Sequence, residues 1–231
     1  MDVHVIDLPE WAVGRGKAMN DFPSIDPART TLLVVDMQNA FMLPGMPVTN
    51  GPTAEIVPNI NRLIAAARDA GVLVSWSRQT HVDEGPGRLA EWQRREDGLM
   101  AAAAVAFRTG TLGHQIHADL DVRNDDLVFD KYRFSCFYNA AIDYEATLRA
   151  RDIDTVIITG TLTNCCCETT ARDAVMRGFK NFFLSDATGA LTDAEHNAAL
   201  LNVRILSSEV IDTDAMVAII RESIPAAVAA E

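Results

Sequence analysis

The stretch "TVIITGTLTNCCCETTARDAVMRG", residues 155–178, joins two structural patterns. Its first six residues are rich in branched apolar side chains, which is typical of a buried strand. Residues 164–178 have the pattern of a helix that ends at Gly178. A strand that leads directly into a helix is half of a βαβ unit, so this stretch predicts a parallel sheet. Cysteines 165–167 stand at the predicted start of the helix.

The same alternation extends to both sides of this stretch and predicts one domain over residues 1–231. The expected fold is α/β, with three layers (α/β/α) around a central, mostly parallel sheet of six strands. Residues 1–29 are expected to form an N-terminal arm, 79–125 a lid or contact segment, and 225–231 a fraying tail. Strands are expected at 30–36, 72–77, 126–131, 155–160, 181–187 and 204–211, and helices at 56–71, 139–152, 164–178, from 192 onward, and at 213–223.

Composition narrows the classes of partner. The formal net charge of −12 disfavours nucleic acid and anionic membrane surfaces. The apolar runs are far shorter than the roughly 20 residues of a membrane-spanning helix, and the N-terminus lacks the pattern of a signal peptide. The four cysteines are too few for a disulfide framework. We therefore expect a cytoplasmic protein with reduced thiols and a small-molecule substrate.

Three reactive residue types fall at ends of the predicted strands. Asp36 closes the first strand, Lys131 closes the third, and the cysteine triplet follows the fourth. In open parallel sheets, ligands bind outside the carboxyl ends of the strands. A thiol at a helix N-terminus is favoured as thiolate, a carboxylate can accept its proton, and an ammonium can orient that carboxylate. These residue types are suited to acyl transfer.

The triplet also has plainer interpretations. Successive side chains on a helix are about 100° apart, so at most one of the three thiols faces the sheet edge. The other two are expected to be small buried apolar residues, and periodicity does not identify which. Three adjacent cysteines lack the spacing of a zinc site, and His114 and His117 have no second cluster of ligands nearby. We expect no metal and no cofactor, and the roles of His81, His114 and His117 stay open.

Three blocks of this sequence resemble the isochorismatase-like cysteine hydrolases, a family that includes nicotinamidase, N-carbamoylsarcosine amidase, ureidoacrylate amidohydrolase and isochorismatase. "LLVVDMQNAF" (32–41) is similar to the block that carries the catalytic aspartate, and "DKYRFSCFYNA" (130–140) to the block that carries the lysine. "GTLTNCCCETTARDA" (160–174) resembles the block that carries the nucleophile. The resemblance covers residues 29–212, and the three blocks together are highly specific.

The resemblance implies a role for each matching residue. Cys166 matches the nucleophile, and Asp36 and Lys131 complete the triad as base and orienting cation. A cis peptide is implied between Thr161 and Leu162, which would place the backbone N–H groups of Leu162 and Cys166 together as an oxyanion hole. The implied reaction cleaves a C–N bond of a small amide, or of a ureido or carbamoyl compound, through a Cys166 thioester. Family members are usually homo-oligomers, so a dimer or tetramer is expected.

Departures from the family patterns refine these expectations. The metal-binding Asp-x-His motif of nicotinamidases is absent from "SRQTHVD" (77–83), and the second and third blocks look most like the ureidoacrylate and carbamoyl-amide branch. The presence of Cys166 favours C–N hydrolysis over the vinyl-ether hydrolysis of true isochorismatases. The sequence is also compatible with a non-catalytic module on this fold and with a redox thiol protein that uses Cys136. Possible pocket residues are Phe41, Trp76, Arg78, Phe137 and Tyr138, and Lys131, Arg78 or Arg133 would suit a carboxylate-bearing substrate.

Overall fold

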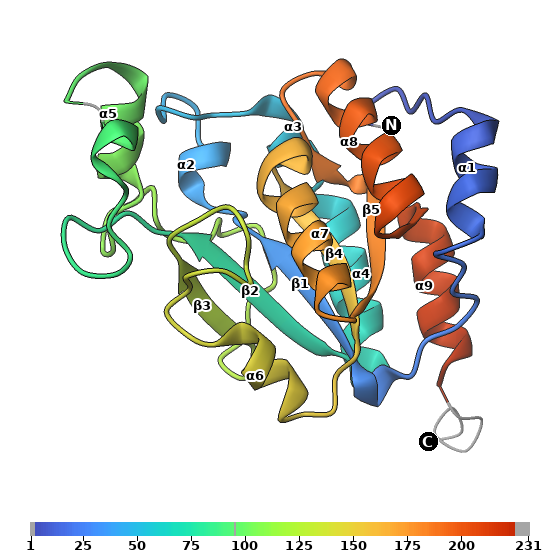
Figure 1. Ribbon diagram of the computed structural model, residues 1–231. Helices are drawn as coiled ribbons and strands as arrows, with labels where there is room; N and C mark the ends of the chain where they lie inside the picture. Colours follow the sequence, from blue (N-terminus) through green and yellow to red (C-terminus); the bar gives the residue numbers. More distant parts are fainter. Residues whose placement is uncertain (1–2, 95, 225–231) are drawn as a thin grey trace.

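A computed structural model describes residues 3–94 and 96–224. Its centre is a six-stranded sheet in which every neighbouring pair of strands is parallel, as the sequence predicts (Figure 1). The strand order is β3-β2-β1-β4-β5-β6. The strands are β1 (Thr30–Val35), β2 (Leu73–Gln79), β3 (Leu127–Lys131), β4 (Thr155–Thr161), β5 (Lys180–Gly189) and β6 (Glu209–Ile211).

The order of the strands reverses between β1 and β4. On one side of β1 lie β2 and then β3. On its other side lie β4, β5 and β6, in that order. Val35, the last residue of β1, is paired with Gly160 near the end of β4. The crevice outside the carboxyl ends of two such strands is the place where open α/β sheets bind ligands. Asp36 follows β1 directly, and the cysteine triplet lies in the turn after β4.

Helices cover both faces of the sheet (Figure 1). Side chains alternate between faces along a strand, so Leu32 and Val34 of β1 pack toward one layer while Leu33 and Val35 pack toward the other. The first layer holds α4 (Val57–Asp69) and α9 (Thr213–Glu222). The second holds α6 (Tyr144–Arg149), α7 (Glu168–Met176) and α8 (Asp193–Leu206). Both cores are buried, as a three-layer fold requires.

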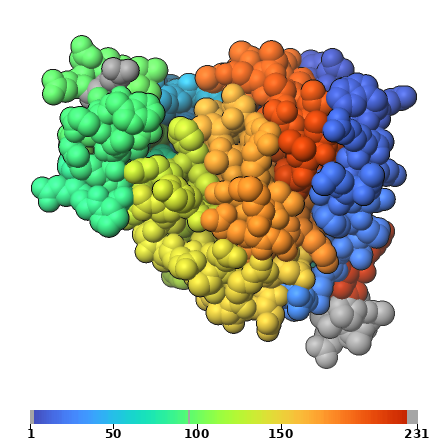
Figure 2. All heavy atoms as spheres, in the orientation of Figure 1, coloured from blue at the N-terminus to red at the C-terminus, as the bar shows by residue number. Residues whose placement is uncertain are grey.

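Shorter helices connect or flank these layers. The N-terminal arm contains α1 (Glu10–Lys17), which lies against α8, and the 3₁₀ turn η1 (Pro27–Arg29). α2 (Asn39–Met42) and α3 (Gly51–Glu55) follow β1. The lid segment after β2 contains η2 (Glu91–Gln93) and α5 (Gly98–Ala106), and it projects to one side of the body (Figures 1 and 2). The expected fraying tail at 225–231 lies outside the described residues.

Two predicted elements begin several residues later in the structure than the sequence predicts. The sequence predicts a strand from residue 204, but residues 204–206 continue α8, and β6 begins only at Glu209. The helix is favoured here because Arg204 is buried and donates a hydrogen bond to Glu209 across the turn, at 2.6 Å between Nη1 and Oε2. The helix expected at 139–152 begins at Tyr144, because the Asp143 carboxylate caps it by accepting from the Ala146 N–H.

Within the described part of the chain, none of the helices combines the length and apolar character needed to span a bilayer.

Candidate active site

Asp36 lies immediately after β1 and is completely buried. Its φ angle of 51° is in the left-handed region, which is uncommon for residues other than glycine and is often found at functional sites. Its carboxylate oxygen Oδ1 accepts a hydrogen bond from the Ser77 hydroxyl on β2, at 2.7 Å. The other oxygen, Oδ2, is 2.7 Å from the Lys131 ammonium. The carboxylate is therefore fixed from two neighbouring strands.

Lys131 ends β3 and is also completely buried. Besides Asp36, its Nζ donates to the Gln79 side-chain oxygen at 2.9 Å and to the Arg133 carbonyl oxygen at 3.0 Å. Burial acts to lower the pKa of Lys131, but its surroundings, with the Asp36 carboxylate foremost, hold that pKa above its ordinary value. The side chain is thus a permanent cation inside the site.

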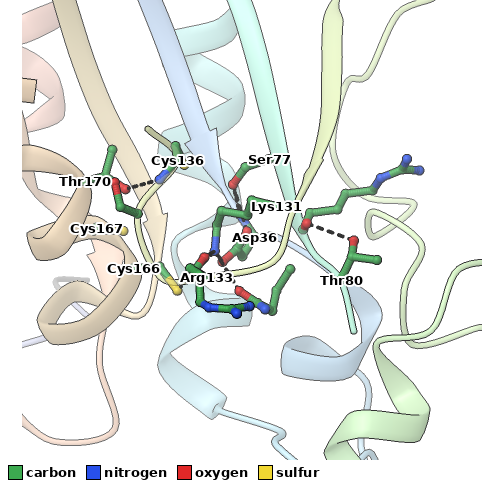
Figure 3. A network of polar contacts seen from close by, with 12 residues as sticks. Asp36, Ser77, Thr80, Lys131, Arg133, Cys136, Cys166, Cys167 and Thr170 are labelled. Carbon is green, nitrogen blue, oxygen red and sulfur yellow. Dashed lines mark hydrogen bonds and ion pairs between the residues drawn. The ribbon is translucent and has the colours of Figure 1, made fainter. Parts of the chain in front are cut away.

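Cys166 is the thiol of the triplet that points toward this cation. Its Sγ lies 3.4 Å from Lys131 Nζ, and Figure 3 shows the sulfur directed at the group formed by Lys131 and Asp36. A hydrogen bond with the Cys165 thiol, together with burial, raises the pKa of Cys166, and the Lys131 charge opposes that rise. The resting thiol therefore keeps its proton, and reaction at this sulfur requires a base close by.

The other cysteines have different surroundings. Cys167 is completely buried, and its Sγ approaches the Thr159 carbonyl oxygen of β4 at 3.8 Å, away from Cys166 (Figure 3). Cys165 is partly exposed. Burial raises the pKa of Cys136 to about 11, with opposition from Lys131. Of the three thiols in the triplet, the one that hydrogen-bonds to Lys131 is Cys166. The other two point elsewhere because successive residues of the helical turn point in different directions.

The backbone between β4 and α7 presents Cys166. A cis peptide joins Thr161 and Leu162, where the family resemblance implied one, and a single π-helical turn, η3 (Thr163–Cys167), follows. The Leu162 carbonyl oxygen accepts from the N–H groups of Cys165 and Cys167, at 3.1 and 3.2 Å. π-helical turns occur frequently at functional sites.

Gly160 permits this turn to approach β1. Its φ is +107°, and a Cβ atom here would overlap the backbone of Val35, the residue before Asp36.

A cavity of about 380 Å³ lies beside the buried cluster of Asp36, Lys131 and Cys166. Gln79 and Arg133, which both contact Lys131 Nζ, line it together with residues of the lid. Three aromatic residues of the β3–α6 connection, Tyr132, Phe134 and Tyr138, form part of the wall. The cavity thus combines an aromatic wall with two polar residues, Gln79 and Arg133, that contact Lys131.

Of the five pocket residues suggested by the sequence, Tyr138 lines this cavity. Phe41 and Trp76 belong instead to the core beneath the sheet, because the alternation along β2 turns Trp76 toward α4. Phe137 packs against Tyr144 in the opposite core. Arg78 points away from Asp36 and Lys131 and pairs with Asp130, at 2.7 Å between Nε and Oδ1. These four residues therefore do not line this cavity.

Sequence reasoning did not identify Ser77, Gln79 and Gln38 as site residues. Gln38 clamps the backbone of Gln79 by accepting from its N–H at 2.8 Å and donating to its carbonyl at 3.1 Å. This leaves the Gln79 side chain free to accept from Lys131. The available signal was positional, since Ser77 and Gln79 are polar residues at the carboxyl end of β2, the edge of a parallel sheet at which ligands bind.

The histidines left open by the sequence have separate positions. His81 lines the cavity, and its buried Nδ1 has no hydrogen-bond partner among residues 3–94 and 96–224. Burial, together with the charges of Lys131 and Arg133, lowers its pKa, so the ring is neutral. His114 bonds to the Thr80 hydroxyl, and His117 lies near Asp119. Over the described ranges, no group of three or more His, Cys, Asp or Glu side chains is placed to hold a metal ion.

Comparison with known proteins places the chain in a family. A family model described as the isochorismatase domain matches residues 30–215. A ureidoacrylate amidohydrolase of Methylobacterium radiotolerans is 33% identical over 208 residues, which cover 83% of this chain and 80% of that protein. Nicotinamidase 3 of Arabidopsis thaliana is 31% identical over 186 residues, which cover 79% of this chain and 84% of that protein.

A solved structure has the same fold. The crystal structure of a cysteine hydrolase from Pseudomonas syringae pv. phaseolicola superposes with a TM-score of 0.79 at 32% identity, covering 88% of this chain and 97% of that one. Residues 30–215, which the family model matches, contain the whole sheet, the strand-end aspartate and lysine, and the turn that carries Cys166. The chain belongs to the isochorismatase family.

Proposed function

We propose that this isochorismatase-family hydrolase is a cysteine-dependent amidohydrolase that cleaves a C–N bond of a small amide, or of a ureido or carbamoyl compound. One observation carries the proposal: a completely buried ammonium, Lys131 Nζ, contacts both a carboxylate at 2.7 Å and a thiol at 3.4 Å. A base and a nucleophile held by one cation are the parts that covalent catalysis requires. The relatives named ureidoacrylate amidohydrolase and nicotinamidase support the same reaction class.

In the first half of the proposed reaction, Asp36 takes the proton from the Cys166 thiol, and the resulting thiolate attacks the carbonyl carbon. The negative charge that develops on the carbonyl oxygen is accepted by the backbone N–H groups of Leu162 and Cys166. Asp36 then passes the proton to the nitrogen as the C–N bond breaks. Ammonia or an amine leaves, and the acyl group stays on Cys166 as a thioester.

In the second half, Asp36 takes a proton from water, and the hydroxide attacks the thioester carbonyl. The tetrahedral adduct collapses, the C–S bond breaks, and the proton on Asp36 returns to the Cys166 sulfur. The net reaction consumes one water and gives an acid and an amine. Lys131 stabilises the carboxylate form of Asp36 and the thiolate form of Cys166 throughout, since it contacts both.

The charge of Arg133 supports a substrate that carries a carboxylate. Its guanidinium donates to the carbonyl oxygens of Gly87, Tyr132 and Arg88, which anchors the lid loop at the cavity. None of the ion pairs found among the described residues includes Arg133. A ureido acid would place its carboxylate near this cation while its carbonyl carbon reaches Cys166.

A screen for ammonia release tests both parts of the proposal. Ureido acids, the corresponding neutral ureido amides, and simple aromatic amides are supplied to the wild-type chain, with Cys166→Ala as the blank. We expect release that depends on Cys166, and a preference for the acids that Arg133→Met reduces through KM. Turnover by Cys166→Ala equal to that of the wild-type chain would contradict the proposed mechanism. A preference for neutral amides would overturn only the choice of substrate.

A further inference from the structure

Two buried histidines stack against each other behind the turn that carries Cys166. His4 belongs to the N-terminal arm and His196 to the first turn of α8, and their ring centroids are 4.2 Å apart at an interplanar angle of 17°. Their exposed fractions are 4% and 0%. The arm is held in place by Asn197, which donates to the Val5 carbonyl at 2.8 Å and accepts from the Asp7 N–H at 2.7 Å.

The partners of His196 define where its proton lies. Nε2 is 2.9 Å from the Ser185 carbonyl oxygen, which only accepts, so Nε2 carries the hydrogen. Nδ1 is then the acceptor of the Thr163 hydroxyl, at 2.9 Å. Both nitrogens of the neutral ring are satisfied by this one tautomer.

The partners of His4 fix its ring in the opposite tautomer. Nε2 accepts from the Ala190 backbone N–H at 3.2 Å. Nδ1 therefore carries the hydrogen and donates it to the Asp193 carboxylate at 2.8 Å. The two rings thus form a fully satisfied pair, and each ring has one bond to the backbone of β5 or the residue that follows it.

His196 bonds to the segment that presents Cys166, and His4 bonds to the residue after the neighbouring strand β5. Thr163 is the first residue of the η3 turn, three positions before Cys166. Ala190 follows Gly189, which is paired with Thr161 at the end of β4. The histidine pair therefore acts on both sides of the Thr161–Leu162 peptide unit: His196 holds Thr163 through its hydroxyl, and His4 holds Ala190, next to the β5 residue that is paired with Thr161.

We propose that His196, supported by His4, is a positioning residue of the active site: it holds Thr163, and thereby sets the direction of the Cys166 sulfur. The inference rests on the proposed role of Cys166 as nucleophile. It extends the site to the N-terminal arm, because His4 lies outside residues 30–215, the part of the chain that the family model matches.

A double-mutant cycle in kcat tests this inference. His196→Phe keeps the ring stack and removes both hydrogen bonds, and Thr163→Val removes the hydroxyl at nearly constant volume. Each is expected to lower kcat about tenfold with KM within about twofold, since displacement of a reacting group lowers the rate steeply. The double variant should be no slower than either single variant, because both remove the same link. Thr163→Ser should retain kcat within about twofold.

Thr31→Val is the matched control. Its buried hydroxyl bonds to Ser75 at 2.7 Å, near the opposite end of β1 from Asp36, so its loss should affect stability and leave kcat unchanged. Full kcat in Thr163→Val, or losses that multiply in the double variant, would overturn the inference. If His196→Phe does not fold, the Thr163→Val and Thr163→Ser pair decides in its place. Wild-type activity of Cys166→Ala would instead overturn the proposed function on which the inference rests.

Discussion

At the scale of single residues, Lys131 holds together groups that would otherwise be poorly tolerated. A buried carboxylate without a cation is costly, and here the Asp36 carboxylate has the Ser77 hydroxyl on one oxygen and Lys131 on the other. The same ammonium also contacts Cys166 and Gln79. An ion pair that served stability alone would not require a contact with the thiol. The effect of removing Lys131 on stability can therefore be measured separately from its effect on catalysis.

Lys131→Met should abolish most activity and also destabilise the fold. Breaking a buried ion pair by removing one partner costs about 3–5 kcal/mol. The double variant Lys131→Met/Asp36→Asn removes both charges, so it should recover part of that stability in urea unfolding while kcat stays at least about 100-fold reduced. Activity of the double variant close to the wild-type level would show that the pair is structural only.

At the scale of elements, the positions of Asp36, Lys131 and Cys166 were accessible to sequence analysis. Each follows or ends an apolar run, and the carboxyl ends of parallel strands meet at one edge of the sheet. The choice of Cys166 within the triplet needed more than periodicity: it came from the match to a family motif. The structure supplies the physical reason, since the η3 turn directs Cys167 to β4 and Cys166 to Lys131.

Other features were not accessible because they depend on tertiary contacts. The role of Gln79 arises from Gln38, 41 positions earlier, and the stack of His4 on His196 joins segments at opposite ends of the chain. The extension of α8 through residue 206 was missed because Ile205 and Leu206 suit a strand or a helix, and the buried contacts of Arg204 decide between them. Aromatic residues of the core and of the cavity wall look alike in sequence, as Trp76 and Tyr138 illustrate.

At the scale of the whole molecule, the N-terminal arm and the sheet domain share one buried ionisable pair. Burial, and the proximity of His4, lower the pKa of His196 to about 4 from 6.5. Above pH 6.5 the ring is neutral in both the folded and the unfolded chain. As the pH falls below 6.5, the unfolded chain binds a proton that the folded chain does not bind, so stability decreases until about pH 4.

This linkage gives a prediction for unfolding in urea. The contribution of His196 to the free energy of unfolding should fall by about 3 kcal/mol between pH 7 and pH 4, from 1.36 kcal/mol per pKa unit. The quantity to measure is the difference between the wild-type chain and His196→Phe at each pH, which cancels the titration of distant carboxylates. A difference that stays constant with pH would contradict the neutral, buried state of this ring.

The proposed reaction depends on a single covalent intermediate, in which Cys166 carries the acyl group. The most direct measurement is mass spectrometry of the protein quenched in acid during turnover of the best substrate from the ammonia-release screen, followed by peptide mapping of residues 158–174. We expect an added mass equal to the acyl group on Cys166 and none on Cys165 or Cys167. In Cys166→Ala, both the added mass and the release of ammonia should disappear. Acylation of Cys165 or Cys167, or full turnover by Cys166→Ala, would contradict the proposed reaction.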